Sequence, residues 1–171
     1  NPFVVESKMI DQVTKFLDKN ISFDIFSNIQ PDPSQELVEE GKKALKNSNP
    51  NLICAIGGGS AIDATKAIIY DIYKEEKVKK IFVAIPTTAG TGSESTNFAV
   101  VTVGSEKKVL IDDIMLPDYA LLIPKFTKTV PNCITADTGM DVLTHAIEAY
   151  ISKNASIYTC LLYTSLMARG R

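Results

Sequence analysis

Apolar and polar positions along the chain switch between helical and strand-like spacing. The first apolar residues recur three or four positions apart, which predicts an amphipathic helix that ends near Asn20. Its apolar residues are Val5, Met9, Val13, Phe16 and Leu17. Over residues 21–25, apolar and polar side chains alternate one by one, and this pattern predicts a strand.

A second helix is predicted to begin at Asp32, a typical N-cap residue that is followed by Pro33 at the first helical position. Gln35 is placed to complete a capping box. The helical pattern stops near Asn49.

The middle of the chain contains two continuous apolar runs, residues 52–56 and 81–85, which predict strands buried on both sides. A helix follows the first run directly, and its expected buried side carries Ile62, Thr65, Ile68, Ile69 and Ile72. A β-hairpin is predicted around Gly104, and a last short strand over residues 119–123. Alternating helices and strands of this kind predict an α/β fold with a parallel sheet covered on both faces.

Composition narrows the class of protein. The chain has 171 residues, of which 45% are hydrophobic and 22% charged, as in soluble globular domains. Its net charge of −2 gives no basic footprint for nucleic acid or for an anionic membrane surface. No apolar run approaches the roughly 20 residues of a membrane span. We therefore expect a cytoplasmic protein without nucleic-acid or membrane partners.

Glycines separate the first buried strand from its helix. In the run Gly57-Gly58-Gly59-Ser60, glycine lets the backbone approach a pyrophosphate closely, and the helix N-terminus offers free N–H groups. The run matches neither standard phosphate-binding fingerprint, so a plain strand-to-helix turn is the alternative. Three successive glycines cost backbone entropy that a plain turn does not require, and this favours phosphate binding.

A second candidate loop, PTTAGTGSES, follows the other buried strand at residues 86–95. Hydroxyl groups of Thr87, Thr88 and Thr91 suit phosphate, ribose or amide groups at the carboxyl end of a parallel strand. The alternative is a flexible, solvated loop. Lys107 follows the hairpin turn, where a surface lysine is the default unless a nucleotide lies nearby.

The last helical pattern, from residue 131, places Asp137, Asp141, His145 and Glu148 on one stripe. A carboxylate and an imidazole four positions apart can bind one divalent metal from the same side of a helix, and they suit iron or zinc. His145 is the one histidine of the chain. A structural Asp–His pair is therefore as good an interpretation of the spacing alone.

Three segments together carry a resemblance to a known family. GGGSAIDATKA (57–67), IPTTAGTGSE (85–94) and TADTGMDVLTHAIEAY (135–150) resemble, in order and spacing, signatures of the iron-containing (group III) alcohol dehydrogenases. The resemblance extends over about residues 1–159, and its wording is most similar to short-chain propanol and ethanol dehydrogenases.

The resemblance implies a Rossmann-like nucleotide-binding domain followed by the start of an all-helical metal-binding domain, the fold shared with dehydroquinate synthase. Residues 1–130 would form the first domain, without the family's first strand. Residues 131–159 would give the first helix of a truncated second domain, and residues 160–171 form a tail that does not resemble the family.

The implied reaction is metal-dependent transfer of a hydride between a primary alcohol and the nicotinamide of NAD or NADP. The metal, Fe²⁺ or alternatively Zn²⁺, would polarise the alcohol oxygen so that the alkoxide passes hydride to the nicotinamide C4. Its first two ligands would be Asp141 and His145. The implied cofactor-binding residues are Gly58, Gly59, Ser60, Asp63, Thr87, Thr88, Thr91 and Lys107.

In the family, two further histidine ligands come from downstream helices that this sequence does not contain. We therefore expect the fragment itself to be inactive, and the full-length protein to act on a small alcohol or aldehyde as a homo-oligomer. The alternative from another class is a non-catalytic nucleotide-binding or oligomerisation module.

Overall fold

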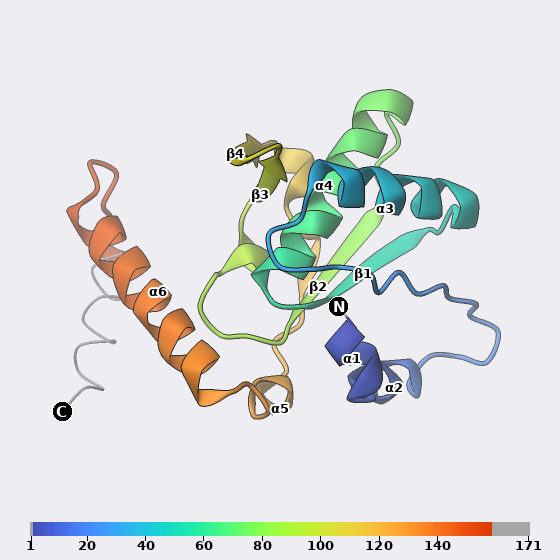
Figure 1. Cartoon of the computed structure of the whole chain (residues 1–171), viewed down its shortest axis with the longest axis horizontal. Coiled ribbons are helices and arrows are strands. Elements are labelled where there is room, and N and C mark those ends of the chain that lie inside the picture. The colour runs from blue at the N-terminus through green and yellow to red at the C-terminus, as the bar shows by residue number, and fades with distance from the viewer. Residues whose placement is uncertain (1, 159–171) are drawn as a thin grey trace.

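The computed structural model describes residues 2–158 and shows a parallel sheet with helices on both sides (Figure 1). Its elements are α1 (Pro2–Glu6), α2 (Met9–Thr14), α3 (Gln35–Ser48), β1 (Leu52–Gly57), α4 (Gly59–Glu76), β2 (Ile81–Pro86), the 3₁₀ turn η1 (Ser93–Ser95), β3 (Phe98–Val103), β4 (Glu106–Ile111), the 3₁₀ turn η2 (Asp113–Met115), β5 (Tyr119–Ala120), α5 (Pro124–Thr127) and α6 (Asn132–Ile151). None of the helices within residues 2–158 is long and apolar enough to cross a lipid bilayer.

The sheet places two loops at the same edge. Its strands pair in parallel in the order β1-β2-β5, and β1 and β2 are in register from Leu52 opposite Ile81 to Gly57 opposite Pro86. Because parallel strands end at the same edge of a sheet, the glycine run and the threonine-rich loop leave side by side. The predicted α/β class is confirmed, although the last strand is shorter than the predicted residues 119–123.

Side chains from both faces of the sheet are buried, as the continuous apolar strands predict. On one face, strand residues pack against α4; this cluster contains Ala55, Ile62, Ile69, Phe82 and Ala84. On the other face, they pack against α1, α2 and α5; this cluster contains Val4, Met9, Ile85 and Phe126. The five residues predicted for the buried side of α4 are all buried.

The predicted hairpin is confirmed as a separate two-stranded sheet. Strands β3 and β4 pair antiparallel from Phe98 opposite Ile111 to Val103 opposite Glu106. Gly104 turns the chain with a φ of 63°, a conformation that glycine adopts without strain. Val101 of this hairpin packs against α3 and α4, and so fixes the hairpin on the helical layer.

The single first helix predicted up to Asn20 is wrong: the structure has two short helices, α1 and α2. The chain breaks between them at Lys8, whose φ is 56°. Val4 and Met9 belong to the same buried cluster. Five positions apart, they would point about 140° away from each other on a continuous helix, and the break allows both to face the sheet.

The strand predicted over residues 21–25 is also wrong. This segment crosses from α2 to α3 without secondary structure, and Ile21, Phe23 and Ile25 are each about half exposed. Alternation shows only which side chains would share a face. A strand also requires a neighbour for its backbone hydrogen bonds, and no strand within residues 2–158 pairs with this segment.

The N-cap of α3 is Ser34 and not the predicted Asp32. The Ser34 hydroxyl accepts a hydrogen bond from the Leu37 N–H at 3.3 Å. Asp32 has a positive φ of 54° and forms an ion pair with Lys107 instead. The predicted end is confirmed, because Asn49 caps the helix in the left-handed conformation.

The close approach of α3 to α4 generates a test. A Cβ added at Gly41 would lie 2.2 Å from Cδ1 of Ile68, whereas a Cβ at Gly139 in α6 would meet nothing within 4 Å. We expect Gly41→Ala to be less stable than Gly139→Ala by about 1–3 kcal/mol, the usual cost of overpacking. Urea unfolding followed by circular dichroism measures the difference, and equal stabilities of the two variants would contradict this account of the helix pair.

Candidate active site

The glycine run forms the junction between β1 and α4. Gly58 is the N-cap of α4, so the N–H groups of Gly59 and Ser60 belong to the first turn and have no acceptor within the helix. They lie at the positive end of the helix dipole, which favours an anion such as a phosphate. At Gly57, a Cβ would lie 2.6 Å from Cβ of Ala61, so the junction itself excludes a side chain.

The threonine-rich loop packs directly onto this junction. The Thr87 N–H donates to the Gly57 carbonyl at 2.9 Å. A Cβ on Gly58 would lie 3.2 Å from Oγ1 of Thr88, and a Cβ on Gly59 would lie 2.9 Å from Cγ2 of Thr91. The structure therefore brings the predicted glycines and threonines together; a Cβ on Gly59 would displace Thr91, and a Cβ on Gly58 would crowd Thr88.

Asp63, also predicted for the cofactor, uses both carboxylate oxygens within the chain. Oδ1 accepts from the Ser93 hydroxyl at 2.5 Å and Oδ2 accepts from the Val100 N–H at 3.0 Å. Asp63 thus lies one turn into α4, beside the glycine junction, and holds the far end of the threonine-rich loop.

Lys66 is a residue that the sequence analysis did not select. Its side chain is fully buried, with 0% exposure, beside the loop end that Asp63 holds. The available signal is its position between Thr65 and Ala67 on the face of α4 that the apolar pattern assigns to the core. A lysine there requires polar partners, because lysine is almost never fully buried without them.

Lys107 lies near the turn of the β3–β4 hairpin, and its ammonium pairs with Asp32 at 2.7 Å. Both side chains are about two-thirds exposed, with values of 63% and 64%. This pair connects the hairpin to the segment before α3. The structure records this contact for Lys107 and none with the glycine junction.

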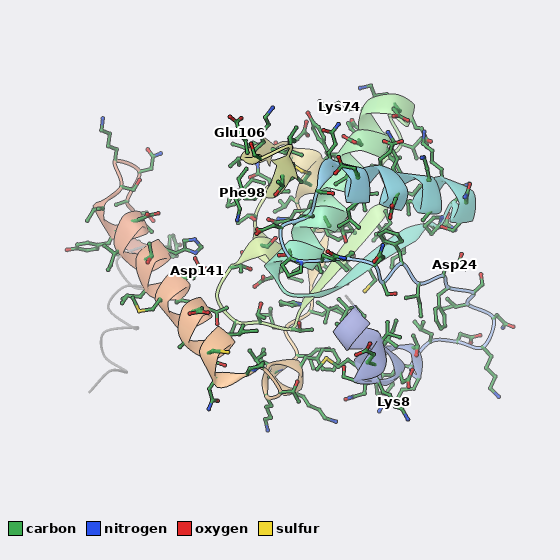
Figure 2. The ribbon with its side chains drawn as sticks, in the orientation of Figure 1. Lys8, Asp24, Lys74, Phe98, Glu106 and Asp141 are labelled. Carbon is green, nitrogen blue, oxygen red and sulfur yellow. The ribbon has the colours of Figure 1, made fainter. Side chains whose placement is uncertain are left out.

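Asp141 and His145 lie on the same side of α6, and Oδ1 of Asp141 is 3.6 Å from Nε2 of His145. In Figure 2, Asp141 lies on the side of α6 that faces the sheet and its helices. Their side chains are 41% and 53% exposed, so further ligands can reach them. Within residues 2–158 no group of three or more His, Cys, Asp or Glu side chains can hold a metal, so Asp137 and Glu148 do not complete a site.

The threonine-rich loop also contacts the helix that carries this pair. A Cβ on Gly90 would lie 2.7 Å from the carbonyl oxygen of Thr138 and 2.8 Å from its Cβ. Thr138 precedes Asp141 by about one helical turn. One loop thus touches both the glycine junction and α6. In Figure 1 this loop runs between the start of α4 and α6.

Comparison with known families identifies the chain. Residues 1–124 match the sequence model of iron-containing alcohol dehydrogenase, and residues 135–169 match that of the C-terminal part of the Fe-containing alcohol dehydrogenase family. The chain belongs to the iron-containing alcohol dehydrogenase family. The second match includes residues 160–169 of the tail, which lie outside the described residues, and the predicted domain limits stay predictions.

Relatives of known activity and structure place the chain within this iron-containing family. It is 41% identical over 159 residues to the 1-propanol dehydrogenase of Citrobacter freundii, with 92% of this chain and 43% of the relative covered. The iron-containing alcohol dehydrogenase structure from Thermotoga maritima matches with a TM-score of 0.82 and 32% identity, over 95% of this chain and 48% of that one. The sulfoacetaldehyde reductase of Bifidobacterium kashiwanohense, solved with NAD⁺, matches with a TM-score of 0.78 and 32% identity, over 88% and 44%. The chain thus spans less than half the length of these relatives.

The loop-to-α6 contact generates a second test. In Gly90→Ala the new methyl group meets the backbone of Thr138, which no side-chain rotation can relieve, so the loop or α6 must move. We expect faster amide hydrogen exchange over residues 86–96 and in the first turns of α6, at an overpacking cost of about 1–3 kcal/mol. Gly139→Ala in the same helix is the control and should leave exchange of the loop unchanged. Unchanged exchange in Gly90→Ala would exclude the contact.

Proposed function

We propose that this chain is part of an oxidoreductase that interconverts a primary alcohol and its aldehyde by hydride transfer with NAD or NADP. The observation that carries the proposal is the packing of Thr88 and Thr91 onto Gly58 and Gly59 at the carboxyl ends of β1 and β2. Ligands of open α/β sheets bind at this edge. Family membership supports the reaction class, and the NAD⁺ complex of the sulfoacetaldehyde reductase supports the cofactor class.

In this proposal the glycine junction holds the pyrophosphate of the cofactor. The backbone N–H groups of Gly59 and Ser60 donate to phosphate oxygens, and Gly58, which has no Cβ, lets Thr88 close on the junction beside the phosphate. The α4 dipole adds to the attraction. The chain thereby binds and orients the cofactor through backbone N–H groups. A side chain introduced elsewhere cannot replace these groups.

The hydroxyl groups of Thr87, Thr88 and Thr91 contact the phosphate and ribose groups between pyrophosphate and nicotinamide. Asp63 acts close to the same turn, where its carboxylate holds the loop through Ser93. Lys107 supplies positive charge on the ribose side of the cofactor and gives up its exposed ion pair with Asp32. An exposed ion pair is worth at most about 1 kcal/mol, so this exchange costs little.

Asp141 and His145 fit a divalent metal, because they present one oxygen and one nitrogen donor on the same exposed side of a helix. A metal held there, Fe²⁺ in the first place and Zn²⁺ as the alternative, supplies Lewis-acid polarisation of the alcohol oxygen. Gly90, in contact with Thr138, keeps the cofactor loop and this helix together. In this proposal the cofactor and the metal lie on two sides of this one short loop.

We further propose a division into a nucleotide-binding domain over residues 1–130 and the first helix of a metal-binding domain over residues 131–159. We place the protein in the cytoplasm, with small alcohols or aldehydes as substrates and assembly as a homo-oligomer. The proposed domain boundary lies near Pro131, where the chain passes from the sheet and its helices to α6.

Cofactor binding tests the glycine junction. Gly58→Val places a branched side chain against Thr88, and we expect the dissociation constant of NADH to rise by about tenfold or more, which corresponds to about 1.4 kcal/mol of overpacking. The emission of NADH itself gives the measurement, since the chain has no tryptophan for energy transfer. Gly139→Ala is the control variant. Equal affinity in Gly58→Val and in the unchanged chain would exclude this junction as the pyrophosphate site.

Metal binding tests the Asp–His pair separately. Calorimetric titration with Zn²⁺ should show weak binding, because two protein ligands leave the coordination shell of a zinc site incomplete. We expect both Asp141→Asn and His145→Gln to abolish it. Asp137→Asn, a carboxylate on the same stripe one turn earlier, should leave it unchanged. Zn²⁺ binding that survives in His145→Gln would place the metal elsewhere.

A further inference from the structure

The strongest feature outside the proposed cofactor contacts is the buried ammonium group of Lys66. Burial of an unpaired charge costs several kcal/mol, so the group is retained only where polar partners compensate. Its Nζ lies within hydrogen-bond distance of four oxygens: the Ser93 carbonyl at 2.5 Å, the Ser93 hydroxyl at 3.2 Å, the Thr96 hydroxyl at 3.0 Å and the Phe98 carbonyl at 2.9 Å. They lie between the end of the threonine-rich loop, at Ser93, and the first residue of β3, Phe98.

Asp63 completes this cluster from one turn earlier on α4. The Ser93 hydroxyl donates to Asp63 and accepts from Lys66, so the two charged side chains hold the same serine from one rigid helix. Ser93 is itself buried, with 5% exposure. The loop end is thereby fixed by charge-assisted hydrogen bonds, which are about twice as strong as neutral ones.

The cluster reaches the cofactor residues through one further hydrogen bond. The Ser93 N–H donates to Oγ1 of Thr91 at 3.3 Å, and Thr91 is the residue that packs on Gly59. The other end of the loop is held by the Thr87 N–H on the Gly57 carbonyl. Between these two anchor points lie the residues that face the glycine junction.

We propose that Lys66 is a positioning residue for the nicotinamide cofactor, which with Asp63 fixes Ser93 and through it holds Thr91 against Gly59 before the cofactor arrives. This role rests on the proposed function, because it assumes that the glycine junction receives NAD or NADP. Lys66 itself touches no cofactor atom. It contributes affinity by keeping the loop in its binding-competent conformation.

The charge of Lys66 gives the cluster a pH dependence. Burial lowers the pKa of Lys66 from 10.5 to about 8, while the charged groups that face it, Asp63 from α4 and Glu94 from η1, act in the opposite direction. A loop that loosens exposes Lys66 to water and returns its pKa toward 10.5, so the loosened loop binds the Lys66 proton more tightly than the closed loop does. Between pH 8 and 10.5 the closed loop is therefore favoured, and we expect affinity for NADH to rise with pH in this window.

The same titration changes the stability of the whole fold in the same sense. Between pH 8 and 10.5 the folded chain has released the Lys66 proton while the unfolded chain still holds it. The unfolded state then binds more protons, so the contribution of Lys66 to the free energy of unfolding rises with pH in this window. Tighter cofactor binding together with greater stability distinguishes this titration from general alkaline unfolding, which weakens binding.

The experiment compares the 171-residue chain with Lys66→Met, Lys66→Arg and Lys74→Met by NADH fluorescence between pH 7 and 10. In Lys66→Met we expect the dissociation constant at pH 7 to rise about tenfold, as for a loop that is competent one tenth of the time, and the rise of affinity above pH 8 to disappear. Lys66→Arg should restore part of the affinity because it keeps hydrogen-bond donors at this position. Lys74→Met removes an exposed lysine of the same helix and should change nothing.

Ser93→Ala gives an independent measurement if circular dichroism shows that Lys66→Met does not fold. It removes the hydroxyl that joins Asp63 to Lys66 and should weaken NADH binding by a smaller factor, with the pH dependence retained. Unchanged affinity in a folded Lys66→Met overturns the role of Lys66 and leaves the proposed cofactor function standing. If Lys66→Met does not fold, unchanged affinity in Ser93→Ala has the same meaning. A wild-type chain that does not bind NADH overturns the proposed cofactor function, and the role of Lys66 with it.

Discussion

The parallel, in-register pairing of β1 with β2 is the constraint on which the candidate site depends. It places Gly57 opposite Pro86, so the chain leaves both strands at the same level and at the same edge of the sheet. A parallel pair requires a crossover, here α4, and that helix must begin where β1 ends. The helix N-terminus and the threonine-rich loop therefore meet as a geometric consequence of the pairing.

Helix α4 both packs against the core and carries residues of the proposed cofactor site. Its buried face packs on the sheet and the hairpin, which fixes its axis. Its first turn offers backbone N–H groups, and the next turns carry the charged side chains that hold the loop. Because these groups share one rigid element, their spacing does not depend on the loop. Such support suits a site in which small displacements weaken binding.

The Asp–His pair proposed for the metal lies on a more exposed helix than the proposed cofactor residues. Asp141 and His145 lie on α6, of which Ala146 is the buried residue, while Met140, Ile147 and Tyr150 expose apolar surface. The pair itself is local, because an Asp and a His four positions apart share a side of any helix. What relates it to the proposed cofactor site is the contact of Gly90 with the carbonyl oxygen and Cβ of Thr138.

The sequence by itself determined the elements whose signals are local: the buried strands, the α4 stripe, the hairpin turn and the Asp–His spacing, together with the family motifs. These depend on periodicity and on glycine, which act within a few residues. Prediction from the sequence failed where residues distant in the chain determine the local conformation. The break at Lys8 lets α1 and α2 pack on the sheet, and residues 21–25 lack a pairing strand within the described part of the chain. Only the tertiary structure showed that Asp63 and Lys66 hold Ser93, because their partners lie about thirty residues away in sequence. A hydrogen bond of that span leaves no periodic trace, since it depends on where two folded elements meet.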